Sequence, residues 1–461
     1  MNKEKEYKKE EIEQIKKDAL TYLWPYFHEN EELAKKKPKI YTEGKGMYVK
    51  DIDGKEYLDR FASLLTTVCG HGRKEVADAV YKQMRKIEFF PNYIDSYTVP
   101  AIELAKKLAE ITPGRLSKTF IVNDGSEACE TAIKMAKQYF WNKGKKQKNK
   151  IISKRWSFHG ATYGGVSATG IPWFREPFEP LVPGFVHVMH AWCYHCELDL
   201  DPKTCKLACL KNMEQNIIWE NPDTIAAVIL DPLPGSNTGY PNPPKGYIEG
   251  IRELCDKYGI LLIFDEVQTG FGKTGKMFAC QHWDVVPDIM AIAKGFGGGY
   301  LPIGATITTP EIANEFLSEV GKEFRHGHTF GGHTTACASA LANIEIIEKE
   351  NLVDNAAKMG KYIRDRLDEL EKYHIVGNIQ GIGLLLSVEL VKDKKTKEII
   401  DPKLKVGTWI KNRLYEENII LRNNSEILVI APALTINKKE ADIIINGMDK
   451  TISEAIKHFN L

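Results

Sequence analysis

The chain has no apolar run long enough to cross a membrane. Its longest runs, Ile225–Leu230 and Gly259–Phe264, are far shorter than the ~20 residues that a bilayer span needs. The opening residues, MNKEKEYKKE, contain no apolar segment, so we expect no secretory signal. We therefore expect no membrane partner.

The chain also lacks an excess of charge and a disulfide framework. Its 63 Lys and Arg residues nearly balance 62 Asp and Glu residues, for a net charge of +1, which argues against nucleic-acid binding. Nine cysteines scattered over 461 residues are not a disulfide pattern, and their odd number is typical of a reducing compartment. We expect a cytoplasmic protein of two to four structural domains.

Hydrophobic patterns predict a large α/β domain between two smaller segments. Residues 1–37 are interpreted as helical entry segments, and Met47–Leu58 as a hairpin around an Asp-Gly turn. Apolar runs without alternation indicate strands that are covered on both faces, which is typical of a mostly parallel sheet. The expected helices are Gly72–Ile87, Pro100–Ile111, Ser126–Trp141 and Gly246–Tyr258, and the expected strands are Lys118–Asn123, Ile225–Asp231 and Ile260–Asp265.

The residues after about Ala336 predict a smaller α+β domain. A long helix is followed by strands at Gly383–Glu389 and Ile427–Ile430 and by a closing helix from Lys438. We expect this domain to share its sheet with the N-terminal hairpin. The predicted division is residues 1–70 as an N-terminal part of the small domain, 71–335 as the large domain and 336–461 as the C-terminal small domain.

Three segments carry residues suited to chemistry at the carboxyl ends of strands, where open α/β sheets bind ligands. Asn123-Asp-Gly-Ser-Glu127 joins a strand to a helix, and its backbone N–H groups with the Ser126 hydroxyl could hold a phosphate. The alternative is an ordinary glycine turn with a helix cap.

Asp265 ends a wholly apolar strand, where a carboxylate is costly unless a cation or a protonated ring nitrogen offsets its burial. The alternative is a carboxylate held by backbone donors. Lys294 emerges from an apolar stretch into a glycine run, so burial could keep its amine neutral, as Schiff-base chemistry requires. Its alternative is a lysine whose stem packs in the core while its charge reaches water. Together, a phosphate seat, a carboxylate and an amine indicate pyridoxal 5′-phosphate.

The sequence resembles the class III (ω-amino acid) aminotransferases of pyridoxal-phosphate fold type I, from about Met47 to Asp442. The resemblance rests on several motifs: Phe264-Asp-Glu-Val-Gln-Thr-Gly-Phe-Gly272, Ala293-Lys-Gly295, Asn123-Asp-Gly-Ser-Glu-Ala128, Phe158-His-Gly160 and His326-Gly-His-Thr-Phe-Gly-Gly-His333. It implies a large domain around a mostly parallel, seven-stranded sheet with a smaller α+β domain. Taurine–pyruvate and β-aminoacyl-CoA aminotransferases are similar families.

The resemblance also implies roles for single residues. Gly125 and Ser126 would hold the phosphate, while Phe158 would stack on the ring, with His159 and Gly160 shaping the same turn. Four further roles are implied: Asp265 on the ring nitrogen, Val267 on the ring's other face, Lys294 on the aldehyde, and Thr329 on the phosphate of a neighbouring subunit's cofactor. The last role implies a homodimer or a dimer of dimers. Arg422 would bind a substrate carboxylate; its alternative is a surface arginine.

Several positions depart from the family's usual residues. The stacking residue is Phe158 where Tyr is frequent, and Cys129 replaces a common Asn. Asp231-Pro232 stands where Glu-Pro is usual, and Leu65 stands where many amine transaminases carry a Trp that lines the substrate pocket. The smaller Leu65 predicts a wider entrance and mildly favours a larger donor.

The cysteines 193, 196, 205 and 209 form a Cys-x2-Cys-x8-Cys-x3-Cys pattern that could hold structural Zn²⁺. The short spacing and the helical second pair favour free or buried thiols instead, and we predict no metal.

We therefore expect a ping-pong aminotransferase that passes an amino group to pyruvate or 2-oxoglutarate. The donor would be a simple amine, β-alanine, taurine, another ω-amino acid or a β-aminoacyl-CoA. The alternatives are an aminomutase, racemase or decarboxylase on the same scaffold, or a metal-stabilised binding protein that has lost the cofactor.

Overall fold

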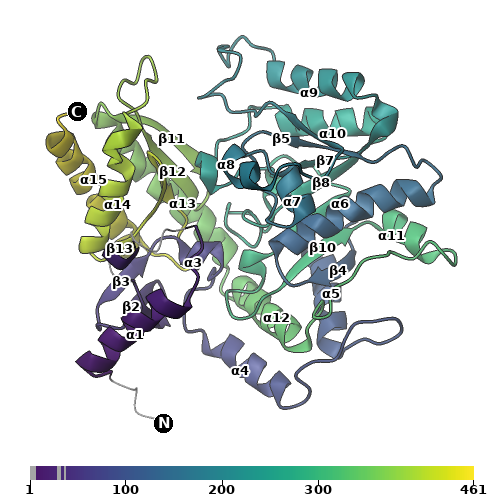
Figure 1. The fold of residues 1–461 in the computed structure, drawn as a ribbon, viewed down its shortest axis with the longest axis horizontal. Coiled ribbons are helices and arrows are strands. Elements are labelled where there is room, and N and C mark those ends of the chain that lie inside the picture. The colour runs from purple at the N-terminus through teal and green to yellow at the C-terminus, as the bar shows by residue number, and fades with distance from the viewer. Residues whose placement is uncertain (1–6, 28–32, 36–37) are drawn as a thin grey trace.

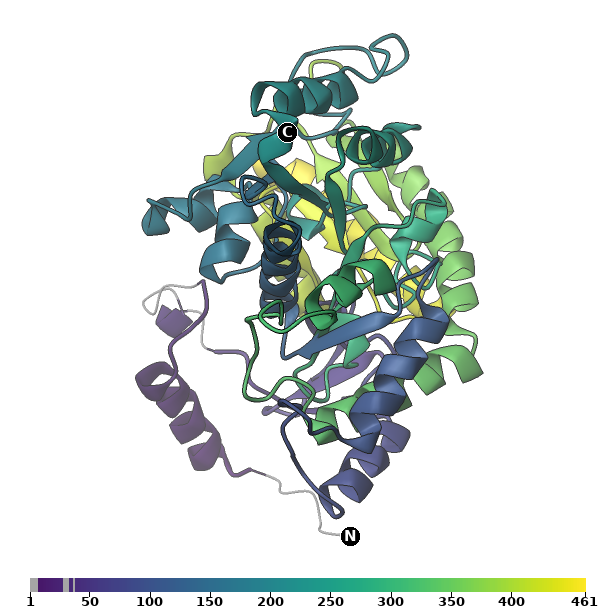
Figure 2. The same cartoon turned by 90° about the vertical axis from the view of Figure 1, so that its right-hand side faces the viewer.

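The computed structural model describes residues 7–27, 33–35 and 38–461, which contain three β-sheets (Figure 1). The helical entry segments expected at the N-terminus are represented by α1 (Lys9–Tyr22), the dark purple helix at the lower left of Figure 2. The remainder of that prediction lies largely outside the described residues. No helix in the described ranges is long and apolar enough to cross a bilayer.

The largest sheet has seven strands and is the predicted, mostly parallel one. Only β10 runs antiparallel to its neighbours. In spatial order the strands are β4 (Lys118–Val122), β10 (Gly304–Thr308), β9 (Ile289–Ile292), β8 (Leu261–Asp265), β7 (Ile225–Leu230), β5 (Lys150–Lys154) and β6 (Phe185–Val188).

Helices cover both faces of this sheet, which is why β7, β8 and β9 are buried along their whole length. On β8, Ile263 packs in the cluster that contains α6, whereas Leu262 and Phe264 pack in the cluster that contains α10. The helices of this part are α4 (Lys74–Met84), α5 (Val99–Ile111), α6 (Gly125–Asn142), α7 (Tyr163–Ala168), α8 (Pro172–Arg175), α9 (Ala208–Trp219), α10 (Tyr247–Tyr258) and α11 (Pro310–Leu317).

Two four-stranded sheets lie beside the large one, in the purple and yellow-green part of Figure 1. One contains β1 (Tyr41–Lys45), β2 (Tyr48–Asp51), β3 (Glu56–Asp59) and β13 (Ile419–Ile420), and the other contains β11 (Val376–Ile382), β12 (Leu385–Leu390), β15 (Ile427–Ile430) and β14 (Arg422–Asn424). The helices around them are α12 (Thr334–Lys349), α13 (Leu352–Asp368), α14 (Val406–Glu416) and α15 (Lys438–Phe459). Short 3-10 turns connect these elements at Glu176–Phe178, Pro222–Thr224, Ser236–Thr238, Ala279–His282, Lys294–Phe296, Glu369–Lys372 and Pro402–Leu404.

The expectation of one shared small-domain sheet is only partly correct. The N-terminal hairpin, β2 and β3, does pair with a C-terminal strand, because β13 runs parallel to β3. The two C-terminal strands that the sequence predicts, β12 and β15, belong to the separate sheet instead. The chain leaves the first sheet at Ile420 and enters the second at Arg422, so the buried Leu421 between them divides what looks like one strand in the sequence. The domain bounds at residues 70 and 335 stay a prediction.

A left-handed turn, α3 (Ala62–Leu65), leads from β3 toward the large sheet. All of its residues have positive φ, a conformation that costs roughly 1–2 kcal/mol per residue for L-amino acids. Asp59 offsets part of this cost, since its carboxylate accepts hydrogen bonds from the backbone N–H groups of Phe61 (3.0 Å) and Ser63 (2.7 Å). The turn places Thr66 in the wall of the cavity described next.

Candidate active site

A cavity of about 480 Å³ lies at the carboxyl ends of the parallel strands. The segments that follow β4, β5, β7, β8 and β9 all reach it because parallel strands end at the same edge. Eight of the residues predicted from the sequence line this cavity, namely Gly125, Ser126, Phe158, His159, Gly160, Asp265, Val267 and Lys294.

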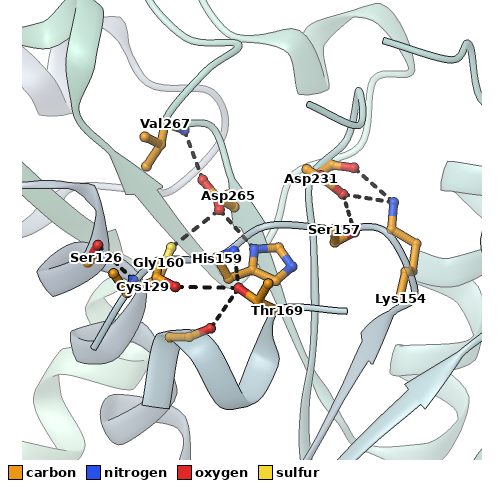
Figure 3. Close-up of polar contacts among 12 residues, drawn as sticks. Ser126, Cys129, Lys154, Ser157, His159, Gly160, Thr169, Asp231, Asp265 and Val267 are labelled. Atoms are coloured by element: carbon orange, nitrogen blue, oxygen red, sulfur yellow. Dashed lines mark hydrogen bonds and ion pairs between the residues drawn. The ribbon is translucent and has the colours of Figure 1, made fainter. Parts of the chain in front are cut away.

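Asp265 is the last residue of β8, and its buried carboxylate is held by three donors (Figure 3). Nδ1 of His159 lies 2.8 Å from Oδ2, and the thiol of Cys129 donates to the same oxygen over 3.3 Å. The backbone N–H of Val267 donates to Oδ1 over 3.0 Å. A carboxylate with this many donors can stay ionised when buried and can hold a cationic group that enters the cavity.

His159 is fixed from both sides. Its backbone N–H donates to Oγ1 of Thr169 over 2.9 Å, and its ring contacts Asp265. The other ring nitrogen, Nε2, is buried and makes no hydrogen bond within the described residues. Nδ1 faces a carboxylate oxygen, which can only accept a hydrogen bond. The proton of the ring is therefore on Nδ1, and His159 donates to Asp265.

The start of α6 forms a seat for an anion. Gly125 and Ser126 open the helix, where backbone N–H groups have no partners within the helix. Oγ of Ser126 accepts a hydrogen bond from the N–H of Ala161 over 3.1 Å, so its own proton is free to donate. A Cβ at Gly125 would lie 2.8 Å from Cγ1 of Val267, and a Cβ at Gly160, where φ is +125°, would lie 2.8 Å from Cα of Ser126. Glycine is therefore required at both positions for the loops to approach this closely.

Lys294 follows β9 and faces the same cavity in a left-handed conformation, with φ of +47°. Burial lowers the pKa of its amine to about 8, while Asp265 opposes this shift and Arg422 adds to it. Near pH 8 about half of the amines are therefore neutral and able to act as a nucleophile. Lys294 is half-buried in the cavity wall, and its role as the amine of the site stays a prediction.

A buried ion pair joins the ends of β5 and β7 beside the cavity. Nζ of Lys154, at the end of β5, lies 2.9 Å from Oδ1 of Asp231, which follows β7. Oγ of Ser157 donates to the same carboxylate over 2.8 Å (Figure 3). Burial alone would raise the pKa of Asp231, but the charges of Lys154 and His159 outweigh it, so the pKa is lowered and the carboxylate is ionised.

Three predicted residues lie outside the cavity wall. Thr329 is exposed, and its contact with a neighbouring subunit's cofactor stays a prediction. The guanidinium of Arg422 on β14 lies 5.3 Å from the ring of Phe61, and no ion pair within the described residues involves it. Leu65 is buried in a cluster with Leu233 and Tyr240, so the wall carries its neighbour Thr66 instead. The prediction that Leu65 widens the entrance therefore gains no support.

Sequence reasoning missed several residues of the wall. Gln268, next to Val267, lines the cavity and accepts a hydrogen bond from the N–H of Ser236 over 3.3 Å. Tyr300 also lines it, from the glycine run after Lys294. From the sequence, Cys129 is recognised as a departure from the family's usual Asn, but no role is assigned to it. A contact between residues that lie 136 positions apart leaves no trace in a single sequence.

Two sets of side chains bear on metal binding. Cys129, His159 and Asp265 have ligand atoms within 4.8 Å of one another, and no other three His, Cys, Asp or Glu residues in the described ranges do. Burial, followed by the charge of Asp265, raises the pKa of the Cys129 thiol well above its ordinary value, whereas a metal-bound thiol must be deprotonated. The cysteines 193, 196, 205 and 209 are half-buried and form no disulfide, and the prediction that they hold no metal stays a prediction.

Comparisons with known proteins agree over nearly the whole chain. The family model for aminotransferase class-III matches residues 31–452. The adenosylmethionine-8-amino-7-oxononanoate aminotransferase of Methanocaldococcus jannaschii is 38% identical over 447 residues, which cover 94% of this chain and 96% of the relative. The taurine–pyruvate aminotransferase of Bilophila wadsworthia is 38% identical over 453 residues, with 95% and 97% covered. The crystal structure of an (S)-enantioselective ω-transaminase from Thermomicrobium roseum superimposes with a TM-score of 0.93 at 38% identity, and covers 96% of this chain and 99% of that one.

Replacing Lys154 by methionine tests the supporting ion pair. Lys154→Met leaves the charge of Asp231 buried without a cation, so we expect the free energy of unfolding to fall by about 3–5 kcal/mol in urea denaturation. The matched control is Lys150→Met on the same strand. Lys150 pairs with Glu220, and both side chains are half-exposed (31% for Lys150 and 35% for Glu220). That change should cost about 0–1 kcal/mol. Equal losses in the two variants would contradict a special role for the buried pair.

Proposed function

Since the chain belongs to the class-III aminotransferases, we propose that it uses pyridoxal 5′-phosphate to move an amino group from an ω- or β-amino donor to a 2-oxo acid by a ping-pong mechanism. The observation that carries the proposal is the single cavity that Asp265, Lys294 and the start of α6 share. The sequence predicted these three features separately, from segments up to 171 residues apart in the chain (294 − 123).

The residues around the cavity fit this cofactor. The free N–H groups at the start of α6 and the Ser126 hydroxyl suit a phosphate, and the two glycines leave room beside them. Asp265 suits a protonated ring nitrogen, because its carboxylate lines the cavity and is paired with hydrogen-bond donors rather than with a lysine or an arginine. Phe158 and Val267 line the same cavity and offer apolar surfaces for a flat ring. Lys294 supplies the amine.

When bound, pyridoxal phosphate supplies an aldehyde that captures amines and a ring that accepts electrons from the adjoining bonds. The protein supplies the rest. Nζ of Lys294 would take the proton from the donor carbon that carries the amino group and pass it to the C4′ carbon of the cofactor. In the second half-reaction it would move a proton the opposite way, from C4′ to the acceptor carbon. The lowered pKa of Lys294, about 8, suits an amine that must both accept and release a proton near neutral pH. Asp265 holds the ring nitrogen in its charged form.

Arg422 is proposed to bind the carboxylate of the 2-oxo acid, with pyruvate or 2-oxoglutarate as acceptors. Its guanidinium has no carboxylate partner within the described residues, and it acts electrostatically on Lys294. The candidate donors are simple amines, β-alanine, taurine and β-aminoacyl-CoA. One relative's name pairs taurine with pyruvate, whereas others name adenosylmethionine and 8-amino-7-oxononanoate, a pair that the sequence reasoning did not consider. The named relatives are aminotransferases, which favours transfer over an aminomutase or racemase reaction.

Absorbance spectra during titration with amino donors test the proposal. The purified protein with pyridoxal phosphate should show a visible band that a true donor bleaches and that a 2-oxo acid restores. The donor with the fastest bleaching identifies the substrate class. Lys294→Ala should bind the cofactor without forming the lysine-dependent band and should lose turnover. A band that survives every donor would favour the aminomutase or racemase, and no band at all would refute the proposal.

Removing the guanidinium of Arg422 tests its role in acceptor binding. Arg422→Ala should raise the KM for the 2-oxo acid through the loss of about 2–4 kcal/mol of charge-assisted contact, and should leave the KM for a simple amine nearly unchanged. Steady-state kinetics with both substrates give the comparison. Arg413→Ala, which removes a guanidinium that pairs with Glu454 of α15, is the control and should change neither KM. An unchanged acceptor KM in Arg422→Ala would remove Arg422 from the site.

We further propose that the active unit is at least a homodimer. An exposed apolar surface, which we call the aromatic patch, consists of Phe90, Tyr93, Ile94, Tyr97 and Phe330. The rings of Phe89 and Phe330 lie 5.2 Å apart, so the segment before α5 and the loop that carries Thr329 lie side by side. Apolar surface of this kind is typical of protein interfaces. Because it adjoins Thr329, a second copy of this chain is the partner that fits.

A charge within the aromatic patch should separate the subunits. Ile94 is 84% exposed, so Ile94→Asp should not disturb the monomer, and its positive φ suits aspartate. We expect sedimentation at twice the chain mass or more for the wild type and a shift toward single chains for the variant, with weaker cofactor binding. Trp219→Asp, at the exposed end of α9, is the control and should sediment like the wild type. A wild type that sediments as a single chain would refute the homodimer.

A further inference from the structure

Cys129 contacts the carboxylate at the centre of the site. It lies on α6 three residues after Ser126, one helical turn deeper, and so on the same face of the helix. Its side chain is 1% exposed, lines the cavity and donates to Oδ2 of Asp265 over 3.3 Å (Figure 3). No other cysteine lines the cavity.

The thiol is present as S–H rather than as a thiolate. Burial, the charge of Asp265 and the hydrogen bond to it all raise the pKa of Cys129, against a smaller opposing effect of Lys294; Asp124 adds slightly to the rise. A protonated, buried thiol is a poor nucleophile and a poor metal ligand. The role left for Cys129 is to donate a hydrogen bond to the carboxylate of Asp265.

The donors around Asp265 are unequal. Oδ2 accepts from the ring N–H of His159 over 2.8 Å and from the thiol, while Oδ1 accepts from the N–H of Val267 over 3.0 Å. A thiol is a weak donor, whereas a hydroxyl or an amide N–H in its place would withdraw more of the carboxylate's negative charge. The thiol therefore restrains the position of Oδ2 while it leaves most of the charge on the carboxylate.

We propose that Cys129 is a positioning residue that orients Asp265 and preserves its negative charge for the protonated nitrogen of the cofactor ring. This role rests on the proposed function, because it requires a cationic ring nitrogen in the cavity. The charge of Asp265 would then act electrostatically, through the ring, on the nitrogen of Lys294. When Asp265 neutralises the ring nitrogen more completely, a proton on the nitrogen that Lys294 contributes is repelled less, and the pH midpoint of the visible band rises.

The pH midpoint of the band separates this role from simple packing. Cys129→Ala removes the donor and should raise the midpoint by about 0.5 pH unit, the size expected for one weak hydrogen bond. Cys129→Ser introduces a stronger donor and should lower the midpoint. Cys255→Ala, which removes an equally buried thiol from α10, is the control and should not move it. A purely structural cysteine would give shifts in one direction or none, and either result would overturn the proposal.

Infrared spectroscopy of the full chain without cofactor tests the contact itself. The S–H stretch of Cys129, identified as the band lost in Cys129→Ser, should lie at lower frequency than that of Cys255, because a hydrogen-bonded S–H stretch is weakened. In Asp265→Ala it should move to higher frequency. A band that does not respond to Asp265 would overturn the contact and with it the proposal. If the infrared shift is present but no cofactor binds, the proposed function has failed and the charge-preserving role fails with it, whereas the contact stands.

Discussion

The site depends on the burial of one negative charge at the end of β8. An ionised carboxylate in an apolar strand end is unstable unless donors replace the water that it has lost. Asp265 obtains them from three separate segments: α6 provides Cys129, the loop after β5 provides His159, and its own loop provides Val267. Each donor also belongs to the cavity wall, so satisfying the charge brings together the segments that form the site.

A second buried carboxylate, Asp231, lies at the end of the neighbouring strand. Asp231 at the end of β7 is buried like Asp265, but it is paired with a full cation, Lys154. His159 also helps to lower the pKa of Asp231, so it interacts with both carboxylates. The contrast has a chemical consequence. The charge of Asp231 is balanced by Lys154, so Asp231 can only hold the surrounding loops in place. Asp265 has hydrogen-bond donors but no lysine or arginine partner, and so it is the carboxylate able to hold a cationic ligand.

The sequence predicted the parts of the site that are local. The strands around Asp231 and Asp265 are apolar along their whole length, and the helix that begins at Gly125 follows a strand directly, so their place at one sheet edge follows from the pattern. The contact between Cys129 and Asp265 joins residues that no spacing relates. The division of the C-terminal strands at Leu421 and the turn of left-handed residues before Thr66 depend on tertiary packing in the same way. No local propensity favours four consecutive left-handed residues without glycine.

The same distinction explains why the reaction can be read from the chain more readily than the substrate. Asp265, Lys294 and the start of α6 are fixed to one rigid sheet, and their chemistry follows from their residue types. Arg422 lies on a different sheet, and Thr66 follows a turn whose strained backbone is held by Asp59. Under the proposed function, the residues that meet the substrate would therefore come from two sheets and a strained turn. A difference in how these two sheets pack would move Arg422 relative to Asp265 without changing the contacts within the large sheet. Two relatives accordingly differ in the compounds that their names state, which are taurine and pyruvate in one and adenosylmethionine and 8-amino-7-oxononanoate in the other.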